Sequence, residues 1–298
     1  MNVSSLQHFL DGAVRGRWAF DRGDWHWHDS RGRTWHGNVT GWHQQLPSSS
    51  SSSSSSVVLY GSSHLRELAW EWYRLQHKMP WYHHKRWPPG DLPEKLIHSL
   101  GSGDRAKQYQ DSCDPEHMGW LAGRYGVDLA ACGAPGFVGR RDFARLGMPS
   151  LSCGMKLFLH TPQADELFLD RLASEGMRQP AAVVAEIGVW GARGTRRSDK
   201  LTSTLTEREE IDYFVQLVES RFRKSRIIWV VDHSVVGGPS LDKQIIRYFR
   251  ERPAVPHVAV MDKYRLLDAR PAEMPCRHGC AGPLMRVLAL MVMAAVER

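Results

Sequence analysis

Cysteine is scarce in this chain of 298 residues, and its cysteines do not form metal-binding pairs. The five are Cys113, Cys132, Cys153, Cys276 and Cys280. No two of them have CxxC spacing, which excludes the zinc modules that paired cysteines build. Because their number is odd, at least one thiol has no partner within the chain. The sequence therefore predicts no metal site and no cofactor.

Long apolar runs and blocks of basic residues are also absent. Residues 284–296, the longest apolar stretch near an end, are too few to cross a bilayer and include Arg286, so we expect no membrane span. The first residues lack the charged-then-apolar pattern of a signal peptide. The formal charge of +7 comes from 39 basic and 32 acidic residues spread along the chain. This balance predicts mild attraction to anionic partners, argues against nucleic acid, and says nothing of oligomeric state.

Composition divides the chain into three parts. Residues 1–47 are rich in tryptophan and histidine and show no clear period, except that Trp and His alternate over residues 25–28, as in a half-buried strand. Residues 48–56 are nine consecutive serines, which predict a flexible linker. Residues 57–298 are long enough for one α/β domain. The 12 tryptophans suit carbohydrate stacking, although core packing is the favoured use for most of them.

Apolar runs alternate with helical patterns in the third part. The expected strands are residues 57–60, 127–132, 181–187, 227–231 and 256–261. A capping box of Thr206 and Glu209 starts one helix, and further helices follow Ser240 and Gly282. This alternation predicts a three-layer α/β/α fold with a five-stranded, mainly parallel sheet. Ligands bind such sheets at the carboxyl ends of their strands.

A serine lies at the end of the first expected strand. Residues 57–60 lead into Gly61-Ser62-Ser63, and an amphipathic helix follows. Glycine permits a sharp turn, and the N–H groups that open the helix can stabilise an oxyanion, so the serine is placed to act as a nucleophile. The alternative is that Ser62 or Ser63 only caps the helix. We expect His64 to point into the helix start.

Five short segments, this turn among them, together match the sequence blocks of one known protein family. They are Gly61-Ser62-Ser63 followed by Arg66, Ala185-Glu186-Ile187-Gly188-Val189-Trp190, Asp262-Lys263-Tyr264-Arg265 leading to Arg270-Pro271, residues 276–283 (Cys-Arg-His-Gly-Cys-Ala-Gly-Pro) and Gly16-Arg17-Trp18. In this order and spacing the chain resembles the SGNH (GDSL-like) hydrolase superfamily, nearest to its trichome-birefringence-like and PC-esterase group. The resemblance spans roughly residues 57–298.

The resemblance implies a serine esterase or O-acyltransferase that acts on acyl esters, above all acetyl esters, of a carbohydrate. Ser63 falls on the nucleophile and His278 on the base, with His233 as the next candidate base. The backbone N–H groups of Ser63 and Gly133 would form the oxyanion hole, with Gly136 as the next candidate. The same resemblance implies the secretory pathway, in the Golgi or outside the cell.

Two positions depart from the family pattern. Pro275 stands where the family has an aspartate before the catalytic histidine, so Glu273 or Asp268 would orient His278, or the site would work as a Ser–His dyad. Trp190 stands where the third block has an asparagine. The loss of one oxyanion donor typically costs about 100- to 1000-fold in rate. The alternative is therefore a catalytically impaired, carbohydrate-binding protein of the same fold.

Overall fold

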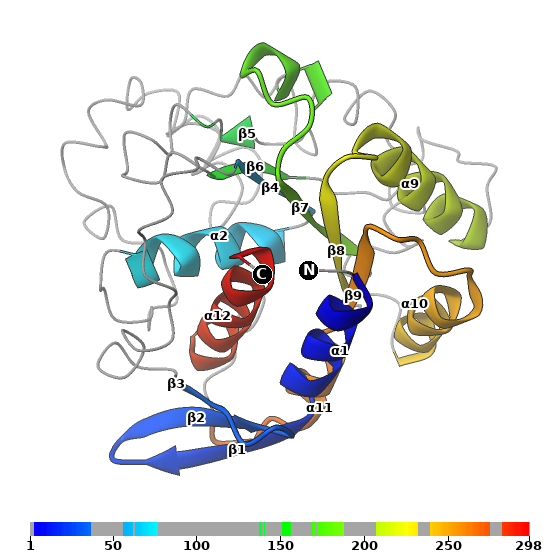
Figure 1. Ribbon diagram of the computed structural model, residues 1–298. Coiled ribbons are helices and arrows are strands. Elements are labelled where there is room, and N and C mark those ends of the chain that lie inside the picture. Colours follow the sequence, from blue (N-terminus) through cyan, green and yellow to red (C-terminus); the bar gives the residue numbers. More distant parts are fainter. Residues whose placement is uncertain are drawn as a thin grey trace, which may run out of the picture.

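The computed structural model describes residues 3–36, 56–61, 63–76, 137–138, 140, 151–155, 169–170, 172–187, 207–231, 239–274 and 282–297 (Figure 1). Its main sheet has the order β5-β6-β4-β7-β8-β9. The strands are β4 (Val57–Gly61), β5 (Phe137–Val138), β6 (Leu151–Met155), β7 (Ala182–Ile187), β8 (Arg226–Val231) and β9 (Val258–Asp262). All neighbours pair in parallel except β5, which is antiparallel to β6. The predicted α/β fold with a five-stranded parallel sheet is confirmed.

Four of the five expected strands occur at their expected places. The fifth expectation, residues 127–132, lies outside the described residues. In the structure β6 pairs with β4, residue Leu151 opposite Val57. The sequence pattern did not single out β6, because its segment LSCGM is short and contains a glycine and a polar serine.

Helices α9 (Glu207–Arg221) and α10 (Pro239–Glu251) cover one face of the sheet (Figure 1). Phe214 of α9 packs edge-on against Tyr60 of β4 and Trp229 of β8. The Trp229 ring also contacts Phe249 of α10. The apolar stripe expected for α9 is buried throughout, which confirms this helix.

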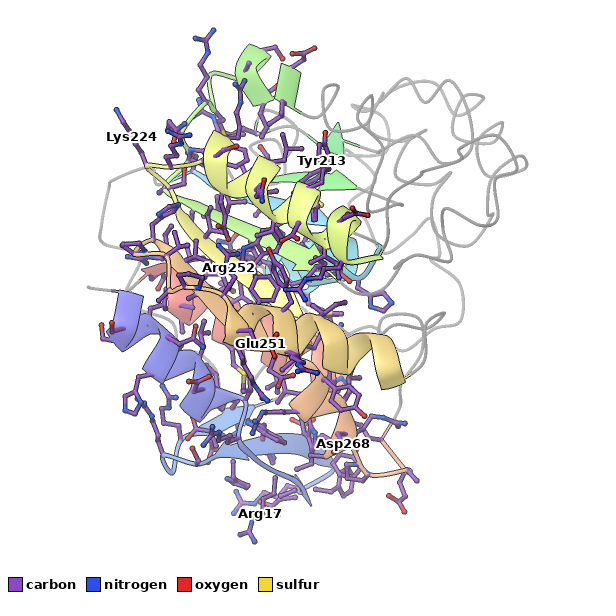
Figure 2. The ribbon with its side chains drawn as sticks, turned by 90° about the vertical axis from the view of Figure 1, so that its right-hand side faces the viewer. Arg17, Tyr213, Lys224, Glu251, Arg252 and Asp268 are labelled. Atoms are coloured by element: carbon purple, nitrogen blue, oxygen red, sulfur yellow. The ribbon has the colours of Figure 1, made fainter. Side chains whose placement is uncertain are left out.

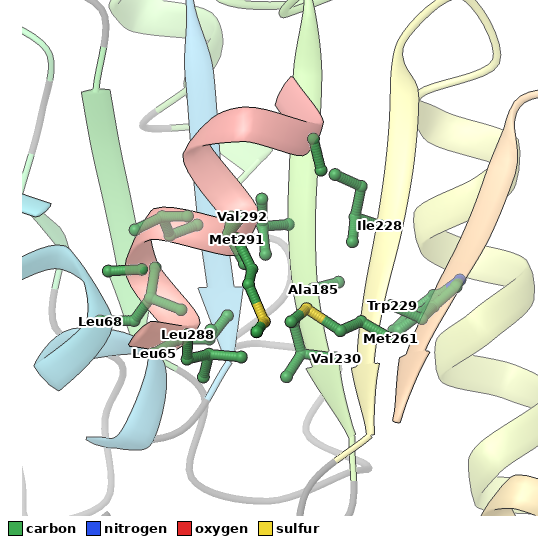
Figure 3. Packing of buried hydrophobic residues seen from close by; sticks show 14 of the residues in the cluster. Leu65, Leu68, Ala185, Ile228, Trp229, Val230, Met261, Leu288, Met291 and Val292 are labelled. Carbon is green, nitrogen blue, oxygen red and sulfur yellow. The ribbon is translucent and has the colours of Figure 1, made fainter. Parts of the chain in front are cut away.

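Helices α2 (Ser63–Gln76) and α12 (Pro283–Glu297) cover the other face. Leu288, Met291 and Val292 of α12 lie over β4 and β7, and Leu65 of α2 lies beside Leu288 (Figure 3). Each fully buried side chain of this size stabilises the fold by about 1.5–3 kcal/mol. The predicted packed helix at residues 284–296 is therefore confirmed. No helix in the part of the chain that the structure describes is long and apolar enough to cross a membrane.

The amino-terminal segment is more regular than its sequence suggested. It forms helix α1 (Val3–Ala13) and an antiparallel sheet of β1 (Gly16–Asp21), β2 (Asp24–Asp29) and β3 (Thr34–His36). The expected Trp/His strand is part of β2. The expectation of no clear period is wrong for α1, where apolar side chains recur at helical spacing and are buried: Leu6, Phe9, Leu10 and Ala13.

Two tryptophans of this segment join the core through both ring and N–H. The Trp27 indole donates to the carbonyl of Ala13 at 2.7 Å, and the Trp18 indole donates to that of Leu266 in α11 (Tyr264–Asp268) at 3.1 Å. Buried indoles that keep a hydrogen bond avoid the cost of desolvating the N–H group. Core packing is thus the use of these two rings. Of the expected serine linker, only Ser56 is described, and its carbonyl accepts hydrogen bonds from the start of β7.

Candidate functional site

The strand order places the topological switch point of the sheet between the carboxyl ends of β4 and β7. The chain leaves β4 towards β6 on one side, and leaves β7 towards β8 on the other. In folds of this kind, ligands bind beyond the strand ends at the switch point. Ser63, the first residue of α2, follows β4 at this point.

Gly61 is required at the end of β4 by close packing. A Cβ atom there would lie 2.6 Å from Cβ of Glu186 and 2.9 Å from Cδ1 of Leu65. Both distances are shorter than van der Waals contact allows, so only glycine fits without movement. The glycine lets β7 and the first turn of α2 approach the strand end together.

The position of Ser63 at the start of α2 has an electrostatic consequence. The first N–H groups of a helix have no partner within the helix and carry a partial positive charge. No acidic side chain lies in the first turn of α2. This end of the helix can therefore donate hydrogen bonds to an anion that forms beside it. The Ser63 side chain itself is outside the described side chains.

Behind Ser63, a histidine and a glutamate meet in the interior. Nδ1 of His64 lies 3.9 Å from Oε1 of Glu186, and the two side chains are 7% and 1% exposed. This distance is beyond a direct hydrogen bond, so the contact is electrostatic. His64, which we expected to point into the helix start, is buried with Nδ1 towards Glu186 of β7. Sequence reasoning did not assign Glu186 a role, although an acidic residue within the apolar run of β7 was a visible signal.

The other expected catalytic residues are not brought together within the described residues. His278, Gly133 and their alternates His233 and Gly136 lie outside them, as do the two departures from the family pattern, Pro275 and Trp190. Their predicted roles remain predictions.

Both candidate acids are described and exposed. Asp268 ends α11, and Glu273 lies in the turn that follows. Arg270 closes this turn through hydrogen bonds from Nη1 to the carbonyls of Pro271 (3.3 Å) and Met274 (2.8 Å). Met274 is buried, so the turn is anchored at its end while the Glu273 side chain faces solvent. The structure therefore fixes the backbone that carries Glu273 but not a contact of its carboxylate.

A second group of buried charges joins α2 to α12. Nε of Arg286 lies 3.3 Å from Oε2 of Glu71, and both side chains are almost fully buried. Asp24 of β2 lies close enough for Arg286 to act on its titration. Burial raises the pKa of the Asp24 carboxyl above its usual value, and the Trp25 N–H, two histidines and Arg286 partly offset this. These charges sit between two helices and the small sheet, where they hold elements distant in sequence.

Within the described residues, no group of three or more His, Cys, Asp or Glu side chains could hold a metal ion. Comparison with family models, curated proteins and solved structures found no match to this chain.

Proposed function

We propose that this protein is a serine esterase or O-acyltransferase that acts on acyl esters, chiefly acetyl esters, of a carbohydrate. The observation that supports it is the position of Ser63, at the first turn of α2, beyond the carboxyl end of β4 and at the switch point of the sheet between β4 and β7. The five-stranded parallel sheet with helices on both faces agrees with the SGNH-like architecture that the sequence resemblance implies.

The proposed reaction proceeds in two balanced steps. The Ser63 hydroxyl attacks the ester carbonyl carbon while His278 takes its proton, and the carbonyl oxygen becomes an oxyanion. The oxyanion then collapses, the bond between the acyl carbon and the sugar oxygen breaks, and His278 gives its proton to that oxygen. The sugar leaves as a free hydroxyl, and the acyl group stays on Ser63. Water or a second sugar hydroxyl then attacks the acyl carbon, His278 takes the proton of the attacking group, and the proton returns to the Ser63 oxygen as the acyl group leaves it. The enzyme is an esterase if water is the acceptor and an acyltransferase if a sugar hydroxyl is the acceptor.

The oxyanion is stabilised by the helix start. The N–H of Ser63 and that of Gly133 would donate to it, with the dipole of α2 adding a favourable field. Glu273 or Asp268 would hold the His278 ring in the tautomer that accepts the serine proton, or the pair would act without a carboxylate. Trp190 and Pro275, at family motif positions, favour the second candidate: a carbohydrate-binding protein of the same fold with impaired catalysis.

Acetate release from an acetylated xylan or pectin tests the proposal directly. Ser63→Ala should abolish release, whereas Ser62→Ala should retain it, because the resemblance places Ser63 on the nucleophile and Ser62 on the family's aspartate position. A fluorophosphonate probe should label Ser63 in the wild-type chain, as read by peptide mass spectrometry. Full activity in Ser63→Ala, or an adduct on Ser62, would overturn the assignment.

Carboxylate variants separate a triad from a dyad. If Glu273→Gln or Asp268→Asn lowers kcat strongly and leaves KM near its original value, that carboxylate acts through His278 in the transition state. Full activity in both indicates a dyad. Wild-type protein that binds the glycan but neither releases acetate nor takes the probe would support the carbohydrate-binding alternative.

A further inference from the structure

A groove runs along the outer edge of β9, away from Ser63. It lies between α1 and α10, which flank β9 in both views of the molecule (Figures 1 and 2). Its volume is about 880 Å³, in the upper part of the range of about 300–1,000 Å³ that ligand pockets occupy. We call it the β9 groove. It is separate from Ser63, because β7 and β8 lie between β4 and β9, a span of about 15 Å at the usual strand spacing.

The strand edge inside the groove is already capped. The side-chain amide of Gln7 in α1 donates to the carbonyl of Val260 at 2.8 Å and accepts from its N–H at 2.7 Å. These are the two bonds that an added strand would make at this position. A peptide therefore cannot extend the sheet here without displacing Gln7, and the groove must recognise its ligand through side chains.

Four arginines line the groove, and two of them pair with carboxylates of the protein. Arg252 is held by Glu219 through two hydrogen bonds, and Arg265 donates to Asp262 at 3.2 Å. Arg15 and Arg250 also line the groove. Among the described residues, no ion pair or hydrogen bond is recorded for either of these two guanidinium groups. A guanidinium presents its donors in a planar fork that matches carboxylate or sulfate oxygens.

The groove also has a partly exposed acceptor. The Asp262 side chain lines the groove and is 17% exposed; its Oδ2 accepts from Arg265, whereas its Oδ1 is buried and has no hydrogen-bond partner among the described residues. Burial raises the pKa of Asp262 above its usual value, which Arg265 and Arg250 partly offset. The exposed part of this carboxyl group can accept a hydrogen bond from a ligand hydroxyl, and in its ionised form it repels a ligand that carries only negative charge. Asp11, at the other wall, adds to this repulsion.

Apolar side chains form the remaining wall. Phe249 and Ile246 of α10 line the groove opposite Val260, and the Phe249 ring is only partly buried. A sugar ring has an apolar face of C–H groups as well as hydroxyls, and aromatic rings suit such faces. Hydroxyl groups, an apolar ring face and a few anionic groups together describe one class of ligand.

We propose that the β9 groove binds an anionic carbohydrate, an oligosaccharide that bears carboxylate or sulfate groups. Its anionic groups pair with Arg250 and Arg15, a hydroxyl group meets Asp262, and a ring face packs on Phe249. The inference goes beyond the proposed function, because it concerns binding at another place and involves neither Ser63 nor an acyl ester.

Binding of defined saccharides to the full chain tests it by isothermal titration calorimetry. An oligogalacturonide supplies carboxylates, a sulfated galactan oligomer supplies sulfates, and a methyl-esterified oligogalacturonide is the neutral counterpart. At least one anionic oligomer should bind at least about tenfold more tightly than the neutral one, since its anionic groups add charge-assisted hydrogen bonds. Whichever anion binds more tightly identifies the group that Arg250 and Arg15 select. Equal binding of all three would overturn the proposal.

Variants on α10 provide a matched comparison. Arg250→Gln should weaken binding about tenfold. Adding Arg15→Gln to this variant should weaken binding further, since each substitution removes one charged donor. Arg247→Gln removes the same charge from an exposed position of α10 that does not line the groove, and should leave Kd within about twofold. If Arg247→Gln weakens binding as much as Arg250→Gln, the effect is nonspecific charge attraction and the proposal fails.

Two further measurements close the test. An acidic peptide such as penta-glutamate should bind more weakly than the anionic sugar, because it offers Asp262 no hydroxyl; tighter peptide binding would overturn the carbohydrate assignment. Ser63→Ala should retain saccharide binding, and Arg250→Gln should retain hydrolysis of a small acetyl ester. Failure at the groove and failure at Ser63 are therefore distinguishable.

Discussion

On the face of the sheet covered by α9 and α10, aromatic rings pack against one another: Phe214 contacts Tyr60 and Trp229, and Trp229 contacts Phe249. The face covered by α2 and α12 instead buries charged groups. Glu186 and Glu71 lie there among leucine and methionine side chains, each beside a basic partner.

The two faces of the sheet contribute in different ways to the fold. Aromatic contacts are favourable on burial and need less exact geometry than a buried charge, although the Trp229 indole also donates to Glu219 of α9 at 3.0 Å. A buried charge costs several kcal/mol of desolvation, which a partner repays only in good geometry. The charged face is also where Ser63 begins α2. We infer that the aromatic face mainly stabilises the sheet, whereas the charged face fixes how α2 and α12 are placed.

The largest expected effect is the loss of one partner of the buried pair. Glu71→Leu leaves the fully buried Arg286 without this carboxylate, which should lower the free energy of unfolding by about 3–5 kcal/mol. The double variant Glu71→Leu, Arg286→Met should recover most of the loss, because it removes both charges. Urea unfolding followed by tryptophan fluorescence measures both.

A substitution on the aromatic face is the control for this comparison. Phe214→Leu should cost only about 1–2 kcal/mol, since a similar volume is kept and the edge-to-face contacts are lost. If Glu71→Leu costs less than Phe214→Leu, the charged face does not differ from the aromatic one in the way described.

Gly61→Ala tests the junction between β4, β7 and α2. The new methyl group would lie 2.6 Å from Cβ of Glu186, and such overpacking typically costs about 1–3 kcal/mol. Thermal unfolding should show the loss, and acetate release should fall as well, because the start of α2 moves. The double variant Gly61→Ala, Glu186→Gly should regain stability. If Gly61→Ala alone leaves the stability unchanged, β7 can shift to make room for the methyl group at little cost.

The smallest expected effect concerns pH and the small sheet. Burial, and then His26, lower the pKa of His36 below its usual value of 6.5. The unfolded chain then binds more protons than the folded one just below this value, so stability falls as pH drops through that window. As the pH falls from about 7 to 5, the free energy of unfolding should decrease less in His36→Gln than in wild type. The difference should be under about 1 kcal/mol, because the His36 ring is partly exposed.

Asp24 provides an internal check with the opposite sign. Its pKa is raised by burial, so above the usual 3.8 the folded chain binds more protons and acidification stabilises it. Asp24→Asn should remove that gain. Chemical denaturation at a series of pH values separates the two groups; identical pH profiles for both variants and wild type would contradict the assignment.

Much of the fold was predictable because local patterns and burial agree. The apolar runs of β4, β7, β8 and β9 are strands buried in a parallel sheet, and such runs are visible in sequence. The stripe on α9 was equally plain. The segment before residue 47 was harder to interpret, because α1 is short and histidine and glycine interrupt its pattern, so its helical spacing was not recognised.

The candidate site divides in the same way. The sequence by itself determined that a serine follows a buried strand and opens a helix, since glycine, serine and helical spacing are local signals. Only the tertiary structure decided which strand lies beside β4, and therefore that Glu186 packs on Gly61 and meets His64. Strand order depends on contacts between residues far apart in sequence, and no local pattern encodes them. For the same reason the pairing of Glu71 with Arg286, and the meeting of α1 and α10 across β9, became visible only once the chain was folded.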